Sequence, residues 1–558
     1  MACVRRWWAA FAPLAALILG DGAAAAAEPP AGGIALPHGI HLGRNGRYYQ
    51  DQCDHDYRFP CLSKRLLPPT YRPEAGNAGG SGSYCGCGSG SACGGGGAAP
   101  PDSSMTPTNV LSAYKIPASS AAGGKIVALI EMPDQSAFAD VNVYRKAFKL
   151  PELPQCGSAT NGLPDPEGGT PCFAAVDEDG NLTTTVTDCQ SSDGEAGLDM
   201  DMVSAACPDC SILLVQMTSA DENEGPTDES FIDAVRTAIR LGAAATSISF
   251  GGGEFRDPTG HDFTQPGHLV LAAAGDSGYL NGGVGGVSPS YPASAPDVLS
   301  VGGTTLKQSG DTYTEVVWNN GRGGGGATGS GCSTEFPMPA FQTTFLASTP
   351  NAFGTCTNRA ANDLSAAADF DAGNFETAIG EYDAIDGWVP STGTSAATPM
   401  LGAILTRLGL TDLVSANLGW VYTNIGAFND ITSGANDVTG TCASVMCKAG
   451  TGYDGPSGVG TPNGQKLAAL IAPSVPDAGD EDGGGDDAGD GGDGGDGRDA
   501  GGDGGGAKPA GHASPTTETA GCACRIGTRP ALDGLSLFAV IGVVGVALRR
   551  RRTRPTWE

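Results

Sequence analysis

Positive charges are scarce in this chain. Its 558 residues include 31 Lys and Arg against 61 Asp and Glu, which gives a formal net charge of −30 at pH 7. Phosphates require clustered cations, so this balance argues against a nucleic-acid partner. A surface with so few cations loses charge as its carboxylates protonate, and mild acid would therefore reduce its self-repulsion.

Aromatic residues are also few, at 6% of the chain, whereas glycine contributes 88 residues. Part of the length therefore consists of low-complexity sequence that cannot bury a core. Residues 477–505 hold eleven acids and one arginine among glycines. A calcium-binding repeat would need a recurring apolar residue, or a twelve-residue loop that ends in Glu, and both are absent. We predict a solvated, disordered spacer over residues 475–520.

The two ends of the sequence indicate export and anchoring. Residues 1–27 have Arg5 and Arg6, an apolar run and an alanine tract with an A-x-A cleavage site, which is typical of a secretory signal. The paired arginines also leave twin-arginine export open. Residues 531–548 are long enough for a membrane-spanning helix and precede an arginine cluster at 549–554.

The last forty residues resemble the C-terminal sorting tails of myxobacterial surface proteins. The resemblance rests on Cys522 and Cys524, the apolar span and the arginine cluster, over residues 521–558. It implies a processed tail and a cell-surface protein held at the cell envelope. An ordinary single-span membrane anchor is the alternative.

Fourteen of the 17 cysteines lie outside the signal and the tail. An even number in an exported chain favours disulfides over metal thiolates, although the pairing cannot be read from sequence. Cys207 and Cys210 have the spacing of a redox-active pair. Their place in a large exported domain, beside an expected strand, favours a structural disulfide instead.

The chain divides by composition into an N-terminal segment and a large domain. Residues 28–104 carry five cysteines and a Gly/Ser-rich stretch, which indicates a small disulfide-bearing segment followed by a linker. From 105 to 474, apolar runs alternate with amphipathic stretches. This pattern predicts an α/β fold with a mainly parallel central sheet and helices on both faces.

The strongest local motif is Gly393-Thr-Ser-Ala-Ala-Thr-Pro399 before an apolar run. A serine between a Gly-Thr turn and a helix start has an exposed hydroxyl and a backbone N–H available for an oxyanion. The alternative is a helix cap, a position that Ser and Thr prefer. Ser395 is therefore a candidate nucleophile that still needs a base.

Histidine is an improbable base. Three of the six histidines precede the α/β domain, one is in the tail, and none stands in the His-Gly-Thr setting of a subtilisin. The expected strand at 125–132 also has Glu131 where a subtilisin has its aspartate. A Ser-His-Asp triad is thus disfavoured.

Carboxylates are better candidates. Glu195 and Asp199 stand four residues apart in an expected helix, so they share one face about one turn apart. Like charges that close resist ionising together, which suits a proton-sharing pair, although a solvated acidic face is the ordinary alternative. Asp276 follows an apolar strand, at the edge where open α/β sheets place their sites.

These four positions, with landmarks such as Ile248-Ser-Phe-Gly251 and Tyr291-Pro-Ala-Ser-Ala-Pro296, resemble the sedolisin family of serine-carboxyl peptidases. The resemblance covers most of residues 106–465 and implies a subtilisin-like fold and endopeptidase activity in acid. It further implies that Ser395 is the nucleophile, Glu195 the general base and Asp199 the residue that orients it. Asp276, kept protonated, would donate to the oxyanion, which a carboxylic acid can do only while neutral.

The same resemblance implies one structural Ca²⁺. Residues 428–434 and 449–454 are similar to the family's calcium site, which carries over the carboxylates of Asp430 and Asp454 and the carbonyls of Ile431, Gly450 and Gly452. Hard oxygen ligands suit calcium. Two Asp/Gly turns without metal are the alternative.

One departure concerns the N-terminal segment, because residues 28–104 are shorter than the family's usual pro-domain and do not look like one. This places control of a zymogen in doubt. We expect an exported, surface-anchored, monomeric endopeptidase that acts on proteins or peptides. The rival is a catalytically silent surface protein that uses the same fold for binding or scaffolding.

Overall fold

The computed structural model describes residues 39–43, 46–53, 60–67, 99–101, 103–183, 194–217, 228–254, 263–281, 287–321, 325–373, 378–384 and 387–471. Contacts divide the chain into units of residues 1–475 and 476–558, and the described residues all belong to the first. The expected signal, spacer and tail lie outside them. No described helix combines the length and apolar character needed to cross a membrane.

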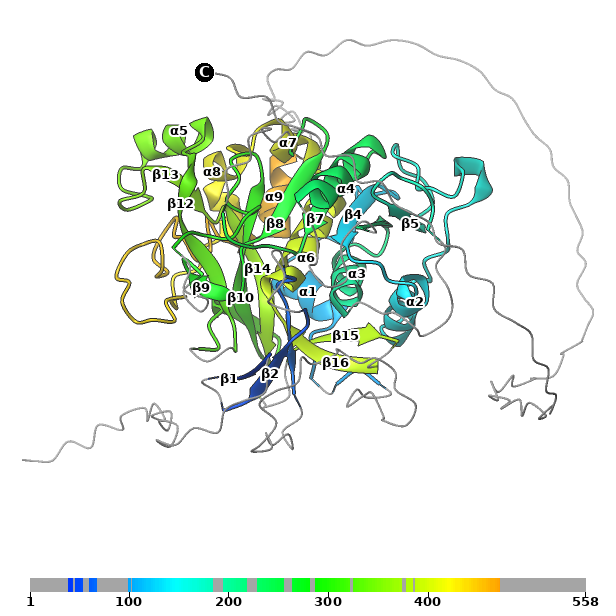
Figure 1. Ribbon diagram of the computed structural model, residues 1–558, viewed down its shortest axis with the longest axis horizontal. Helices are drawn as coiled ribbons and strands as arrows, with labels where there is room; N and C mark the ends of the chain where they lie inside the picture. The colour runs from blue at the N-terminus through cyan, green and yellow to red at the C-terminus, as the bar shows by residue number, and fades with distance from the viewer. Residues whose placement is uncertain are drawn as a thin grey trace, which may run out of the picture. The chain divides into compact units, whose positions relative to one another are not determined.

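A large sheet forms the centre of the first unit (Figure 1). Its strands run in the order β11-β10-β8-β7-β4-β6-β5, and β14 also pairs with β10. Every pair is parallel except β10 with β11. The strands are β4 (Ile126–Glu131), β5 (Phe173–Asp177), β6 (Ser211–Gln216), β7 (Ala245–Ile248), β8 (Leu269–Ala273), β10 (Leu299–Ser309), β11 (Thr312–Val317) and β14 (Leu364–Asp371).

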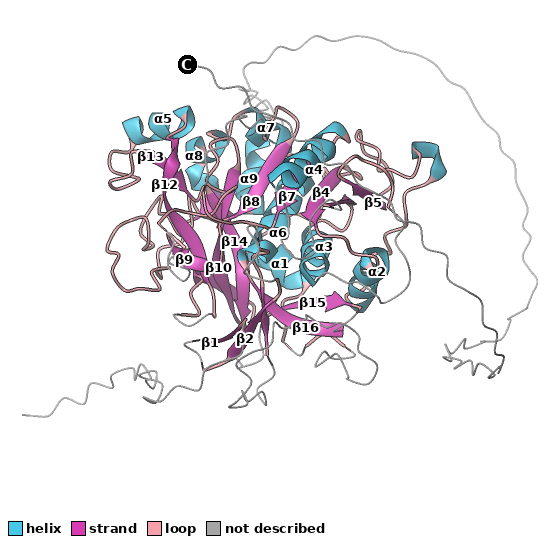
Figure 2. Cartoon of the chain, in the orientation of Figure 1, coloured by secondary structure: helices cyan, strands magenta, loops and turns pink. Residues whose placement is uncertain are grey.

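Helices surround this sheet (Figure 2). They are α1 (Pro107–Ala113), α2 (Ala137–Ala147), α3 (Gly194–Ala206), α4 (Asp228–Arg240), α5 (Ala340–Ser348), α6 (Thr394–Arg407), α7 (Thr411–Ala416), α8 (Trp420–Thr423) and α9 (Gly464–Ile471). The predicted subtilisin-like α/β fold, with a mainly parallel sheet, is confirmed.

Strand β4 shows why helices must pack against both faces of the sheet. Ile126, Ala128 and Ile130 pack with α4 in one core cluster, whereas Val127 and Leu129 pack with α3 and α6 in another. Successive side chains of a strand point to opposite faces, so a strand that is apolar throughout is buried on both.

Smaller sheets flank the central one. They contain β1 (Ile40–Leu42), β2 (Tyr48–Asp51), β3 (Lys64–Leu66), β9 (Ser277–Tyr279), β12 (Ala327–Pro337), β13 (Asn358–Ala361), β15 (Ile379–Asp383), β16 (Gly387–Thr392), β17 (Phe428–Asn429) and β18 (Thr461–Pro462). One sheet has the order β1-β2-β3-β16-β15. Strands from the N-terminal segment therefore pair with the strand that precedes Ser395. The domain boundary expected between residues 104 and 105 stays a prediction. The same sheet, however, contains strands from both sides of that position.

Disulfides are present as the sequence predicted. Cys207 and Cys210 are bonded to each other, in agreement with the structural interpretation of that pair. The described residues contain four further bonds, which are Cys53–Cys61, Cys156–Cys172, Cys332–Cys356 and Cys442–Cys447.

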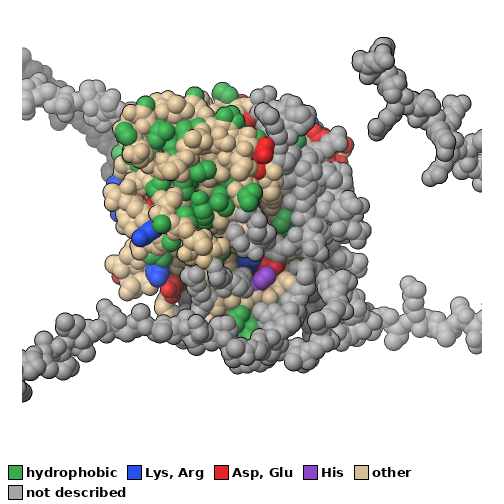
Figure 3. All heavy atoms as spheres, turned by 60° about the vertical axis from the view of Figure 1, so that its left-hand side comes forward, with side chains coloured by type: hydrophobic (Ala, Val, Ile, Leu, Met, Phe, Trp, Pro, Cys, Tyr) green, Lys and Arg blue, Asp and Glu red, His purple; other side chains and the backbone are tan. Residues whose placement is uncertain are grey.

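Acidic side chains are frequent in the interior. On the face shown in Figure 3, apolar and other uncharged side chains are far more common than charged ones. Several carboxyls are instead buried within the described residues, among them Asp140, Glu195, Asp199, Asp201, Asp276, Asp363, Glu381 and Asp454. A buried carboxyl is costly unless it is paired, hydrogen-bonded or protonated, so each of these needs a physical explanation.

Candidate active site

Helix α3 carries two of the predicted site residues into the core. Glu195 and Asp199 are fully buried, and so are the other side chains of the helix from residue 195 onward. The helix packs against α6 on one side and α2 on another. The alternative interpretation, that these two carboxyls belong to a solvated acidic face, is therefore wrong. Apart from Asp201, their neighbours on the same helix are apolar or small, which allows the helix to be enclosed.

Ser395 lies in the first turn of α6, immediately after β16 and Gly393. It is fully buried, and its Oγ donates to the carbonyl oxygen of Ser249 at 3.3 Å. The first N–H groups of a helix have no acceptor within the helix, so the backbone N–H groups of this turn can donate to acceptors outside it. The serine thus occupies the strand-to-helix turn that its motif predicts.

Ser249 connects Ser395 with α3. Its Oγ donates to Asp199 Oδ2 at 2.7 Å and lies 3.5 Å from the carbonyl oxygen of Ser395. Ser249 follows β7, at the carboxyl edge of the parallel sheet. The structure therefore places Asp199 and Ser395 on either side of one residue.

Asp276 follows β8 at the same edge of the sheet. Its Oδ1 accepts hydrogen bonds from the Thr394 backbone N–H at 2.9 Å and the Thr394 hydroxyl at 2.8 Å. Burial raises the pKa of Asp276 to about 7, while the positive charge of Lys64 and the two Thr394 bonds oppose that rise. The carboxyl is consequently protonated in mild acid and can then donate a hydrogen bond.

The other oxygen of Asp276 faces Gly393. A Cβ at Gly393 would lie 3.0 Å from Asp276 Oδ2 and 2.3 Å from the carbonyl oxygen of Leu62. Oδ2 is buried and makes no hydrogen bond among the described residues. Because Gly393 has no Cβ, the carboxyl of Asp276 and the backbone of Leu62 can approach the turn this closely.

No described histidine is a partner of Ser395. His268 is bonded to the carbonyl oxygen of Ala243, and His41 to Asp51. Within the described part of the chain, the hydrogen bonds of Ser395 go to Ser249, Leu62 and the backbone of its own turn. This arrangement agrees with the expectation that the base is not a histidine.

The two loops expected to bind calcium contact each other. The Gly452 N–H donates to Asp430 Oδ2 at 3.0 Å, and the Gly450 N–H donates to Asp454 Oδ2 at 3.1 Å. Asp454 is fully buried, and burial together with the charge of Asp430 raises its pKa to about 7. Among the described residues there is no group of three or more His, Cys, Asp and Glu side chains suited to a metal. The expected set has two carboxylates and three carbonyls, so it does not depend on such a group, and its oxygens fit a hard cation.

Comparison with known proteins places the chain among peptidases. The subtilase (peptidase S8) family model matches residues 182–409. Kumamolisin from Bacillus sp. (strain MN-32) is 30% identical over 404 residues, which cover 68% of this chain and 66% of kumamolisin. The chain belongs to the sedolisin family. Human tripeptidyl-peptidase 1 is 30% identical over 221 residues, which cover 35% of this sedolisin and 36% of that protein.

A solved structure agrees with the assignment. Pseudomonas sedolisin, described as a serine-carboxyl proteinase complexed with two molecules of pseudo-iodotyrostatin, matches with a TM-score of 0.50 at 22% identity. The match covers 67% of this chain and 99% of that one. The similarity shows a shared fold, and the family resemblance inferred from the motifs is confirmed. The proposed likeness of residues 521–558 to a sorting tail lies outside the described residues and stays a prediction.

Sequence reasoning missed three contributors to the sedolisin site. Ser249 was identified only as part of a landmark motif, and Thr394 only as a neighbour of the serine. Residues 60–67, expected in a separate segment, lie against Ser395: Leu62 accepts from its N–H, and the Ser63 hydroxyl donates to Glu195. Nothing local in the sequence around Leu62 signals this contact.

Proposed function

We propose that this sedolisin is an endopeptidase that hydrolyses peptide bonds in acid through an acyl-enzyme intermediate. One observation carries the proposal: Ser395, Asp276 and Asp199 meet at one buried place, linked through Ser249 and Thr394, and Glu195 is joined to them through Ser63, the residue after Leu62. Charged or ionisable groups brought together in the core, without a described histidine among them, are costly for stability alone.

The proposed first step is attack by Ser395 Oγ on a substrate carbonyl carbon. The hydroxyl proton passes to Glu195 as general base, after the hydroxyl turns from the Ser249 carbonyl toward that carboxylate. Asp199, held by Ser249 Oγ, orients Glu195 and increases its basicity. When the intermediate collapses, Glu195 returns the proton to the leaving amine.

The developing oxyanion needs donors. The backbone N–H of Ser395 at the start of α6 is one, and protonated Asp276 is the other, because its Oδ1 is held by Thr394 while Oδ2 faces Gly393. Only the neutral acid can donate, so the activity depends on a pH below the raised pKa of Asp276, which is about 7.

Substitution of the nucleophile tests the proposal. Ser395→Ala abolishes the digestion of casein at about pH 4.5, where a base with an ordinary carboxyl pKa is ionised, and at every other pH. Ser348→Ala, at an exposed position on α5, is the matched control and keeps full activity. Circular dichroism establishes that both variants are folded. Wild-type turnover by folded Ser395→Ala would contradict the assignment.

A silent surface protein is the second candidate function. The observation in its favour is that residues 60–67 cover Ser395 and leave it fully buried. The same assay separates the two candidates, because a scaffold has no turnover for Ser395→Ala to remove.

We further propose one structural Ca²⁺, held by the carboxylates of Asp430 and Asp454 and the carbonyls of Ile431, Gly450 and Gly452. The ion would neutralise two carboxylates that now rely on loop amides. A chelator is expected to lower the thermal midpoint, because a ligand that binds only the folded state stabilises it. Metal analysis of the purified protein accompanies the melts. An unchanged midpoint, together with no bound calcium, would mean that the two loops are Asp/Gly turns that bind no metal.

Export and anchoring at the cell surface are also proposed. They rest on residues 1–27, the apolar span at 531–548 and the arginines that follow it. The disulfides within the described residues fit an oxidising compartment. Accessibility of the intact protein to protease added outside whole cells tests this location.

A further inference from the structure

The strand that follows Asp276 pairs with β12 in an irregular register. Ser277 of β9 lies opposite Ala327 of β12, and Tyr279 lies opposite Ser330. Between these two pairs β12 therefore has one residue more than β9, which is a bulge. Bulges redirect nearby side chains and are frequent beside active sites. This one begins directly after the carboxyl that we assign to the oxyanion.

The bulged strand holds the backbone around Asp276. The Ala327 N–H donates to the carbonyl oxygen of Asp276 at 2.9 Å, and the Gly329 N–H donates to that of Gly275 at 2.6 Å. A Cβ at Gly329 would lie 1.8 Å from the carbonyl oxygen of Ala274, so only glycine permits this approach. Strand β12 thus fixes the backbone from which the Asp276 side chain extends.

Asn436 bonds to both strands where their register is broken. Its Nδ2 donates to the Thr328 carbonyl oxygen and to Ser330 Oγ, both at 2.7 Å. Its own carbonyl oxygen accepts the Tyr279 N–H at 3.1 Å. Asn436 is fully buried. One side chain from a distant loop therefore holds the carbonyl of a residue that the bulge adds to β12.

Gly278 allows Asn436 to come this close to β9. It has a φ of +80°, and a Cβ there would lie 2.6 Å from the Asn436 carbonyl oxygen and 3.0 Å from Val438 Cγ1. A larger residue would meet the loop and strain the backbone. Because Gly278 is only two residues after Asp276, the loop contacts β9 next to the oxyanion acid in the chain.

The loop that carries Asn436 is held in place by further bonds. It runs between the two loops expected to bind calcium, and within it Cys442 and Cys447 form a disulfide. The Asn436 N–H donates to the Cys447 carbonyl oxygen at 3.1 Å, and Ser330 Oγ donates to the Met446 carbonyl oxygen at 2.6 Å. The backbone of Asn436 is thus fixed, and its amide has a defined position.

We propose that Asn436 is a positioning residue for Asp276: it fixes the bulge of β12 that holds the Asp276 backbone and so keeps the acid in place for the oxyanion. The proposal rests on the proposed peptidase function and on the role given there to Asp276. Thr394 holds one oxygen of the acid, whereas Asn436 acts on its backbone through β12. A displacement of about 1 Å at such a group can cost roughly a hundredfold in rate.

Asn436→Ala removes both amide donors. Steady-state digestion of casein at about pH 4.5 is expected to give a kcat at least about tenfold below that of the wild type, with KM changed less than about twofold. Asn142→Ala on α2 is the matched control, because the Asn142 amide also bonds to backbone groups, those of Phe138 and Leu153, and this variant should keep its kcat. Circular dichroism sets an assay temperature at which every variant is folded.

A double-mutant cycle separates positioning from a general loss of structure. If Asn436 acts through Asp276, Asn436→Ala should lower kcat less than about twofold in a chain that already carries Asp276→Ala, because the donor that it positions is gone. A loss of folded protein, or damage to another part of the site, would lower kcat by the same factor in both backgrounds. Equal factors would therefore overturn the proposal.

Ser330→Ala is a milder second variant, which keeps the test open if Asn436→Ala does not fold. It removes one acceptor of the Asn436 amide, whereas the bond to the Thr328 carbonyl stays. We expect a kcat about threefold below that of the wild type, and this loss should disappear in the Asp276→Ala background. An unchanged kcat, or the same loss in both backgrounds, would contradict the proposal.

Casein digestion by the wild type separates the possible failures. If the wild type digests casein and folded Asn436→Ala does so equally fast, this proposal is wrong and the peptidase function stands. If Asp276→Ala keeps the wild-type kcat, the role of Asp276 and this proposal both fail, and the peptidase function still stands. If the wild type digests no casein at any pH, the peptidase function fails and this proposal fails with it.

Discussion

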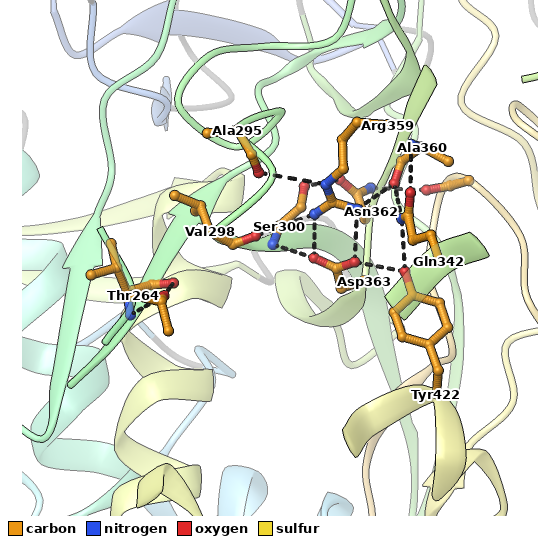
Figure 4. Close-up of polar contacts among 12 residues, drawn as sticks. Thr264, Ala295, Val298, Ser300, Gln342, Arg359, Ala360, Asn362, Asp363 and Tyr422 are labelled. Atoms are coloured by element: carbon orange, nitrogen blue, oxygen red, sulfur yellow. Dashed lines mark hydrogen bonds and ion pairs between the residues drawn. The ribbon is translucent and has the colours of Figure 1, made fainter. Parts of the chain in front are cut away.

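Two buried carboxyl groups in this molecule have different partners and, we infer, different tasks. Asp363 forms a two-pronged ion pair with Arg359, at 2.5 and 2.9 Å, and also accepts from the Tyr422 hydroxyl and the Ser300 N–H (Figure 4). Asp276 is held instead by the hydroxyl and N–H of Thr394. Both are almost completely buried.

The difference in partners decides which protonation state is stable. Burial opposes the charge of Arg359, but Asp363 outweighs burial and raises the pKa of Arg359, so the guanidinium stays charged across the ordinary pH range. For Asp276, burial outweighs both the positive charge of Lys64 and the two Thr394 bonds, and raises its pKa to about 7. Burial alone therefore does not mark a functional carboxyl. A cation bonded directly to the carboxyl, as Arg359 is to Asp363, makes it structural, whereas the neutral donors bonded to Asp276 leave it able to gain a proton and act as an acid.

Breaking the ion pair is expected to have the largest effect on stability. Asp363→Asn leaves Arg359 charged and buried without its partner, which typically costs about 3–5 kcal/mol. Thermal melts followed by circular dichroism measure the loss. Asp412→Asn, which removes an exposed carboxylate 3.9 Å from Lys125, is the control and should change little. A similar midpoint for both variants would mean that the buried pair contributes no more than a surface one.

Removing the neutral acid is expected to act on catalysis instead. Asp276→Ala loses one oxyanion donor, which typically costs about 3–4 kcal/mol, or roughly a hundred- to a thousandfold in kcat. Asp276→Asn keeps an N–H donor and should lose less. Steady-state kinetics at about pH 4.5 give the two values, in a range where wild-type Asp276 is protonated. Equal losses would make Asp276 a structural residue.

A third group of carboxyls gives a smaller effect that depends on pH. Asp140 on α2, Asp201 on α3 and Glu381 on β15 are buried near one another. Burial is the main cause of their raised pKa values, which reach about 7 for Asp140 and about 8 for Glu381.

The sign of the stability change follows from these shifts. Between the ordinary pKa, about 4, and the raised values, the folded state binds more protons than the unfolded state, so stability falls as pH rises. We expect a higher thermal midpoint at pH 4 than at pH 7.5. Asp201→Asn can still accept the Tyr382 N–H, and because it removes one group with a raised pKa it should flatten this dependence. An identical slope for wild type and variant would contradict the interpretation.

Much of this could be predicted from sequence because it depends on local pattern. The four-residue separation of Glu195 and Asp199 in an expected helix predicted that they share one face of α3. Apolar runs such as the one before Asp276 predicted buried parallel strands, and therefore the sheet edge where Asp276 lies.

The contacts that were missed join residues far apart in sequence. Leu62 reaches Ser249 and Ser395 through backbone groups, which every residue has, so its side chain gave no signal. The disulfide pairs likewise required distances that the fold alone supplies. The roles of Ser249 and Thr394 became visible only once their hydroxyls were seen to bond to Asp199 and Asp276.

The most direct test of the account is the pH dependence of kcat/KM for wild type and Asp276→Asn. In the wild type, activity should fall as pH rises through the pKa of Asp276, about 7, because the acid loses the proton it donates. An amide donates at any pH, so the variant's profile should extend toward neutral pH, with its acidic limb still set by Glu195. Profiles of the same shape, differing only in height, would contradict the claim that a protonated Asp276 stabilises the oxyanion.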